Sequence, residues 1–104
     1  MSDTRRSIKL ILLAYQQGSV SAVETSMRIS FLLKTLDFDD KIRLKFDIFD
    51  EVSAKSAHLP ILEQWDNLEK KTKFQYEREI KKIDNDYRLK LQDASADILA
   101  TIEL

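Results

Sequence analysis

The sequence predicts an all-α fold, an antiparallel bundle of four or five helices with a long C-terminal helix. Its 104 residues include one glycine and one proline, which leaves few turns and favours long elements. Apolar residues return every three or four positions through most of the chain, which is the period of a helix. The length fits one domain over residues 1–104.

The first predicted helix covers residues 3–17, and Ser2 or Asp3 can cap its start. Its apolar face consists of Ile8, Ile11, Leu12 and Tyr15. Gly18 follows where a left-handed residue ends a helix, a conformation that glycine adopts without steric cost. Ser21 and Glu24 then form a capping box that opens the next helix. The connection is so short that these two helices must be antiparallel neighbours.

The second predicted helix runs from Ser21 to about Leu36, and four of its side chains are expected to face inward: Val23, Met27, Phe31 and Leu32. Residues 37–40 end it and cap a third helix that extends to about Ser56. Two patterns overlap in this third segment. The apolar residues Ile42, Leu44, Phe46 and Ile48 alternate as in a strand, whereas Ile42, Phe46, Phe49 and Val52 form a helical face. We predict the helix, because a lone strand would leave its backbone groups unpaired.

The C-terminal segment, residues 61–104, has neither glycine nor proline, and Pro60 suits the first position of a helix. Its apolar stripe consists of Ile61, Trp65, Leu68, Thr72, Tyr76, Ile80, Ile83, Tyr87, Leu91, Ala94, Ile98 and Ile102. Four acid-first pairs at i,i+4 favour the helix: Glu69–Lys73, Glu77–Lys81, Asp84–Arg88 and Asp86–Lys90. One helix over this segment would be about 66 Å long. We therefore expect a break near residues 93–95; the alternative is an unbroken helix whose end projects and needs a partner.

Composition and motifs disfavour catalysis, so we predict that the protein is not an enzyme and holds no metal or cofactor. The absence of cysteine excludes disulfides and thiolate metal sites. The only histidine, His58, is expected in a loop or capping role, because histidine catalysis needs an orienting partner. Asp37, Asp39 and Asp40 lack the glycine and distal glutamate of a calcium loop.

Charge and hydropathy narrow the class of partner. The net charge is −1, whereas nucleic-acid-binding proteins usually have a basic excess. A basic run consists of Lys70, Lys71, Lys73, Arg78, Lys81 and Lys82. The glutamates between these residues are expected to pair with the lysines, which favours a solvated helix face over a site for a polyanion. The apolar run from Leu10 to Tyr15 is far shorter than the ~20 residues of a membrane span, and we expect a cytoplasmic protein.

Four carboxylates of the third predicted helix are the candidate binding residues. Asp40, Asp47 and Glu51 are spaced i, i+7 and i+11, with Asp50 beside them, so they form a negative stripe opposite the apolar face. Such a stripe is either the solvated face of a helix or a docking surface for a basic partner.

The first half of the chain resembles the colicin-D-type immunity proteins and their relatives in contact-dependent growth inhibition. The resemblance lies in the sequence Val20-Ser21-Ala22-Val23-Glu24-Thr25, which matches a motif "I/V-S/T-A-x-E-F" at the start of the second helix. Thr25 departs from the motif, which has an aromatic residue there. The similarity covers residues 18–50 and leaves the C-terminal helix unexplained.

The resemblance implies a cytoplasmic, monomeric inhibitor that binds a nuclease toxin, often a tRNA-cleaving one, and covers its basic active site. Asp40, Asp47, Asp50 and Glu51 would then mimic the phosphates of the substrate. The alternative is a helical assembly or regulatory protein that dimerises through residues 61–104.

Overall fold

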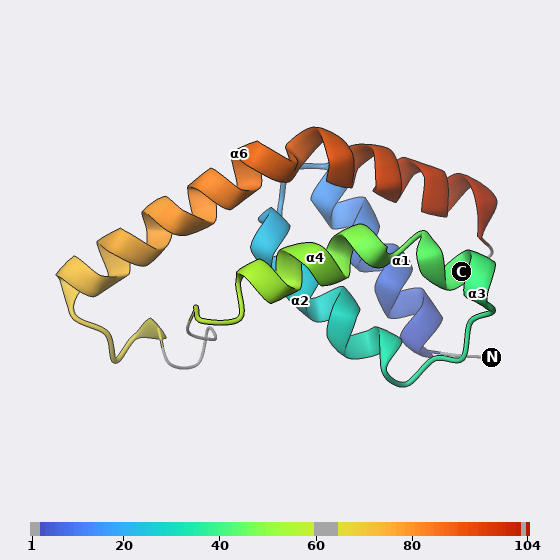
Figure 1. Cartoon of the computed structure of the whole chain (residues 1–104), viewed down its shortest axis with the longest axis horizontal. Helices are drawn as coiled ribbons and strands as arrows, with labels where there is room; N and C mark the ends of the chain where they lie inside the picture. The colour runs from blue at the N-terminus through green and yellow to red at the C-terminus, as the bar shows by residue number, and fades with distance from the viewer. Residues whose placement is uncertain (1–2, 60–64, 103) are drawn as a thin grey trace.

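The structure, a computed structural model, describes residues 3–59, 65–102 and 104, and the regular structure in these ranges is entirely helical. The helices are α1 (Asp3–Gln16), α2 (Ala22–Leu33), α3 (Asp40–Leu44), α4 (Asp47–Lys55) and α6 (Lys70–Thr101). They confirm the predicted all-α fold with a long C-terminal helix (Figure 1).

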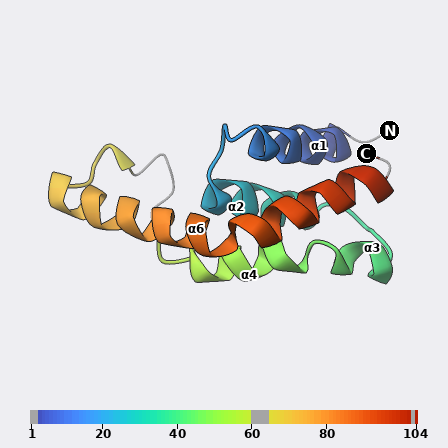
Figure 2. The ribbon, with the colours of Figure 1, turned by 90° about the horizontal axis from the view of Figure 1, so that it is seen from above.

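Four of the helices form an antiparallel bundle. Along the chain, α1, α2, α4 and α6 alternate in direction (Figure 1). Helix α2 packs against α1, α4 and α6, so it is the central element. In Figure 2, α1 and α4 lie on opposite sides of the molecule with α2 between them, and α6 crosses over this layer.

The turn between α1 and α2 is the predicted one. Gly18 has φ +79°, the left-handed conformation that favours glycine. The Gly18 N–H donates to the Tyr15 carbonyl, and the Ser19 N–H donates to the Ala14 carbonyl, both at 3.0 Å. These two bonds form a Schellman motif that satisfies the last carbonyls of α1.

The capping box at α2 is half formed. The Glu24 N–H donates to the Ser21 hydroxyl at 3.1 Å, as predicted. The Glu24 carboxylate accepts from Arg28 at 2.7 Å rather than from the backbone of the cap. Asp84 of α6 supplies the second acceptor, because its Oδ1 accepts the Ala22 N–H at 2.7 Å. A residue 62 positions away therefore completes this helix start.

The predicted inward face of α2 is partly wrong. Phe31 is 66% exposed and Met27 is only partly buried, whereas Val23 is buried as expected. Leu32 packs at the edge of the core. The buried residues of α2 are Ala22, Val23, Thr25, Ser26, Ile29 and Leu33. Because α2 contacts α1, α4 and α6, these residues cover more of its circumference than the single inward face that was predicted.

The third predicted helix is helical, as expected, but it is divided. Asp39 caps α3, with its Oδ1 accepting the Ile42 N–H at 2.9 Å. Phe46 keeps right-handed dihedral angles, φ −95° and ψ 0°, but the N–H groups of Lys45 and Phe46 donate to carbonyls three residues back, so the α-helical ladder is interrupted before α4 starts at Asp47. Phe46, Phe49 and Val52 are buried in the core, as the predicted helical face requires.

The predicted break near residues 93–95 is wrong, because α6 is continuous from Lys70 to Thr101. The second half of α6 lies across the bundle and buries Tyr87, Leu91, Ser95 and Ile98. This tertiary packing stabilises the helix through Asp93 and Ser95, whose intrinsic helix propensity is weak. Of the four predicted i,i+4 ion pairs, only Asp84–Arg88 forms, at 3.2 Å.

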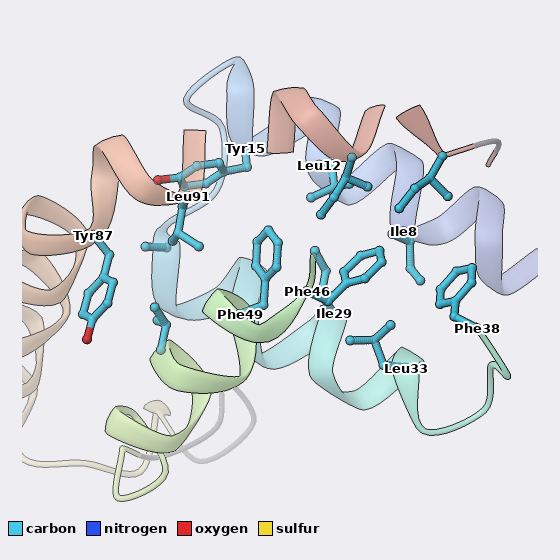
Figure 3. Close-up of a cluster of buried hydrophobic side chains, with 14 residues drawn as sticks. Ile8, Leu12, Tyr15, Ile29, Leu33, Phe38, Phe46, Phe49, Tyr87 and Leu91 are labelled. Atoms are coloured by element: carbon cyan, nitrogen blue, oxygen red, sulfur yellow. The ribbon is translucent and has the colours of Figure 1, made fainter. Parts of the chain in front are cut away.

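One core lies between α1, α2, α4 and the second half of α6. Phe46 and Phe49 are at its centre, with ring centroids 6.2 Å apart, and Phe38 stacks on Phe46 at 5.5 Å. Figure 3 shows side chains from all four helices converging on these rings. Ile8, Leu12 and Tyr15 of the predicted α1 face are buried here, and Ile11 packs at the edge.

Three sequence expectations lie outside the described ranges: Ser2 as a cap of the first helix, Pro60 as the first residue of a helix, and Ile61 in the apolar stripe. Among the helices that the structure describes, none combines the length and hydropathy needed to cross a membrane.

Candidate functional site

The four predicted site residues lie on α3 and α4, which follow each other end to end along one edge of the molecule (Figure 1). Asp40 is the first residue of α3 and Asp47 the first of α4; Asp50 also lies in the first turn of α4, and Glu51 follows it. The structure therefore brings the four carboxylates onto consecutive elements, although the bend at Phe46 interrupts the single helix that the prediction assumed.

Asp50 differs from the others because its partly buried carboxylate is hydrogen-bonded to two other helices. Its Oδ1 accepts from the Ser30 hydroxyl at 2.9 Å, which joins α4 to α2. Its Oδ2 accepts a short, charge-assisted hydrogen bond from Arg43 of α3. The carboxylate thus holds three helices together, and its negative charge is largely compensated by Arg43.

Asp47 is more accessible. Its side chain is 62% exposed, and its Oδ1 lies 4.0 Å from Arg43 Nη1. The N-cap residue Phe46 provides no side-chain hydrogen bond to α4, so the carboxylates of Asp47 and Asp50 are the groups that complement the positive end of this helix. Both residues therefore have a structural role in addition to any role in binding.

An exposed leucine lies among the acidic residues. Leu44 is 64% exposed, and it is four positions from Asp40 on the same face of α3. Asp47 and Glu51 have the same spacing on α4. We call Asp40, Leu44, Asp47 and Glu51 the acidic face. An apolar residue with a charged rim is the usual composition of a protein-binding surface.

The charge around this face is negative overall. Residues 37–51 contain six acidic and three basic residues. Two of the three bases are engaged: Arg43 with Asp50, and Lys45 with Asp97 of α6 at 2.7 Å. The exposed carboxylates of the acidic face thus keep most of their charge available to a partner.

A second surface, which the sequence analysis assigned to a solvated helix face, lies at the other end of the molecule. The first half of α6 projects beyond the bundle in both views (Figures 1 and 2). The radius of gyration is 14.1 Å, which is larger than the radius of about 13 Å for a compact chain of this length, as expected for a projecting helix. We call residues 70–82 the basic arm; they carry six basic and two acidic side chains.

The expected pairing of lysines with glutamates along the basic arm is wrong. In the described parts of the chain, none of its six basic side chains forms an ion pair. Glu79 instead contacts His58, with the Oε2 and Nε2 atoms 2.9 Å apart. His58 thus lies in a loop, as predicted, where it links the segment after α4 to the arm.

An aromatic side chain lies among the free lysines. Phe74 is 62% exposed and shares an open hollow with Lys70, Lys71, Lys73 and Glu77. Phe74 does not belong to the apolar stripe of residues 61–104. No described helix of the chain covers it.

A polar hollow of about 300 Å³ lies beside the Gly18 turn and is lined partly by Tyr15, Asp84 and Arg88. Burial raises the pKa of the Tyr15 hydroxyl, and the nearby Asp84 carboxylate raises it further. Asp84 is occupied by the Ala22 N–H and by Arg88. These residues therefore have a structural role, because they lie where α1, α2 and α6 meet. In the described ranges no three side chains of histidine, cysteine, aspartate or glutamate are grouped as metal ligands.

The model of one protein family matches residues 2–98 of the chain; its description is "Protein of unknown function (DUF2489)". Comparison with curated proteins gave no match. Comparison with solved structures gave none either.

Proposed function

The chain belongs to the DUF2489 family, which has no described function, and from its surfaces we propose that it is a cytoplasmic immunity protein that neutralises a nuclease toxin by covering the toxin's basic active site. On this proposal it acts by binding and not by catalysis. The toxin would be a tRNA-cleaving enzyme, following the resemblance of residues 18–50 to colicin-D-type immunity proteins.

The observation that favours this proposal is the composition of the acidic face. Asp40, Asp47 and Glu51 are exposed, as is Leu44, and Asp47 has only a long contact of 4.0 Å with Arg43. A nuclease active site is positively charged because it binds phosphates, and complementary charge raises the association rate and the specificity of binding. Leu44 would add apolar contact area at the centre of the interface.

The test is an affinity measurement with the C-terminal region of the protein encoded by the neighbouring upstream gene, since such inhibitors are generally encoded beside their toxins. The chain should bind that region and abolish its nuclease activity. The double substitution Asp47→Lys/Glu51→Lys should raise the Kd by about 10- to 100-fold, because each exposed ion pair contributes about 0.2–1 kcal/mol and its reversal adds repulsion of similar size.

The matched control is Asp86→Lys/Asp93→Lys, which makes the same change in net charge at two exposed positions of α6. An unchanged Kd in the first variant, or an equal loss in the control, would reject the acidic face as the binding surface. The absence of any nuclease activity or complex would reject the immunity function itself.

A second candidate function is assembly of copies of the chain through α6. The observation that favours it is the projecting basic arm, where Phe74 is exposed and the basic side chains are unpaired. Light scattering with and without the toxin separates the two functions, because the immunity proposal expects a monomer in the toxin complex and assembly requires an oligomer of the chain alone.

A further inference from the structure

The basic arm contradicts a local rule of helix stability. Lys70, Lys71 and Lys73 occupy the first turn of α6, which contains no acidic residue. The start of a helix has a partial positive charge, so cations are unfavourable there. The N-cap Glu69 makes no side-chain hydrogen bond that would offset this. Local conflicts of this kind are expected at functional sites.

The acidic face of the same chain is complementary to the basic arm in charge. The arm has an exposed phenylalanine among unpaired lysines, and the acidic face has an exposed leucine and three exposed carboxylates, of which Asp47 also contacts Arg43 at 4.0 Å. The two surfaces also match in length. At the helical rise the 13 residues of the arm extend about 20 Å, and the 12 residues from Asp40 to Glu51, which the bend at Phe46 divides, extend at most about 18 Å.

The arm lies at one end of the long axis, which is 43 Å, whereas α3 lies at the other end and α4 runs back from it toward the middle (Figure 1). A two-fold axis perpendicular to the long axis would place the arm of each copy on the acidic face of the other, so both contacts form at once. We propose that two copies of the chain associate in this way, with the basic arm of each docked on the acidic face of its partner. The inference gives the assembly function a specific geometry and does not rest on the immunity proposal.

A second copy explains the arm better than a nucleic acid does. Glu77 lines the same hollow as Phe74, where it would repel a phosphate backbone, and the net charge of the chain is −1. A net charge so close to zero opposes self-association very little. Because the same acidic face would bind a toxin, dimerisation and toxin binding would exclude each other.

A charge-swap experiment on the full chain tests the inference. The first variant reverses the arm with Lys70→Glu, Lys71→Glu and Lys73→Glu. The second reverses the acidic face with Asp40→Lys, Asp47→Lys and Glu51→Lys. Asp50 is left intact because it joins three helices.

Sedimentation equilibrium should give a dimer of the 12.2 kDa chain for the wild type, weakened as salt rises toward 1 M, where the Debye length falls to about 3 Å. Each variant alone should be monomeric, with its dimer Kd raised at least about 10-fold. An equimolar mixture of the two variants should restore the dimer, because both contacts then join opposite charges. The neutral variant Phe74→Ser, which changes an exposed side chain, should also weaken the wild-type dimer.

Three results would overturn the inference. A wild-type chain that is monomeric in low salt would exclude the dimer. A dimer that persists after reversal of the acidic face would show that copies meet through another surface, which leaves assembly in general intact. Tight binding of the monomer to tRNA, lost when the arm is reversed, would assign the arm to a polyanion instead. Thermal melting of each variant confirms that it is folded.

Discussion

Replacing Asp50 by alanine should destabilise the protein much more than the same replacement at Asp47, although both residues belong to the predicted acidic stripe. Asp50 accepts hydrogen bonds from Ser30 and Arg43 and so connects α2, α3 and α4. Asp47 is 62% exposed and lies 4.0 Å from Arg43. Both variants remove one negative charge from the first turn of α4, so this effect cancels in the comparison.

The size of the difference follows from the two bonds. A neutral hydrogen bond such as that from Ser30 contributes about 0.5–1.5 kcal/mol. The pair with Arg43 is partly exposed on both sides, so we assign it about 0.2–1 kcal/mol. Asp50→Ala should therefore lower the free energy of unfolding by about 1–2.5 kcal/mol more than Asp47→Ala. For a domain of this size that corresponds to a Tm difference of roughly 4–15 °C.

Urea denaturation followed by far-UV circular dichroism measures both variants under identical conditions, with the wild type as reference. The slope against urea should be unchanged, since neither substitution alters the surface that unfolding exposes. Ser30→Ala should reproduce part of the loss. Equal stabilities of the Asp50 and Asp47 variants would refute the reasoning, because the bonds of Asp50 would then contribute nothing measurable.

Two further predictions concern α1 and its turn. Gly18→Ala should lower the free energy of unfolding in urea by about 1–2 kcal/mol, because φ is +79° and only the backbone strain contributes: an added Cβ meets no atom within 4 Å. Gly18→Asn should lower it less. A much larger loss for alanine would indicate a steric clash and contradict this reasoning. The second prediction concerns Tyr15, whose pKa is raised in the folded protein. Its contribution to stability is fully present below the unfolded pKa of about 10, and it is lost as the pH rises through the folded pKa. Tyr15→Phe should remove this dependence, so that the stability difference between wild type and variant changes above about pH 10; parallel curves from about pH 9 to 11 would contradict it.

The helices themselves could be predicted from the sequence because their signals are local. The single glycine marked the end of α1, and Ser21 and Asp39 marked the starts of α2 and α3. The faces of α1 and of the segment containing Phe46 and Phe49 followed from helical spacing. Each depends on residues within a few positions of one another, which a sequence displays directly.

The candidate sites were less accessible to this reasoning. The acidic residues were located, but the difference between Asp50 and its neighbours depends on Ser30, 20 positions away, and on the bend that orients Arg43. The basic arm was assigned to a solvated face because glutamates lie four residues from its lysines. In the structure Glu79 contacts His58 instead, a contact that the loop after α4 makes possible.

The sequence by itself determined that this protein is helical, where α1, α2 and α3 begin, and where α1 ends. The tertiary structure decided that α6 is unbroken, that α2 packs through Ala22 and Ser26, and that residues 70–82 extend beyond the bundle. Helix starts and ends depend on hydrogen bonds and dihedral angles a few residues apart. The continuity and exposure of a helix depend on which distant segments cover it. The free energy of this tertiary packing is gained only when the whole chain is folded.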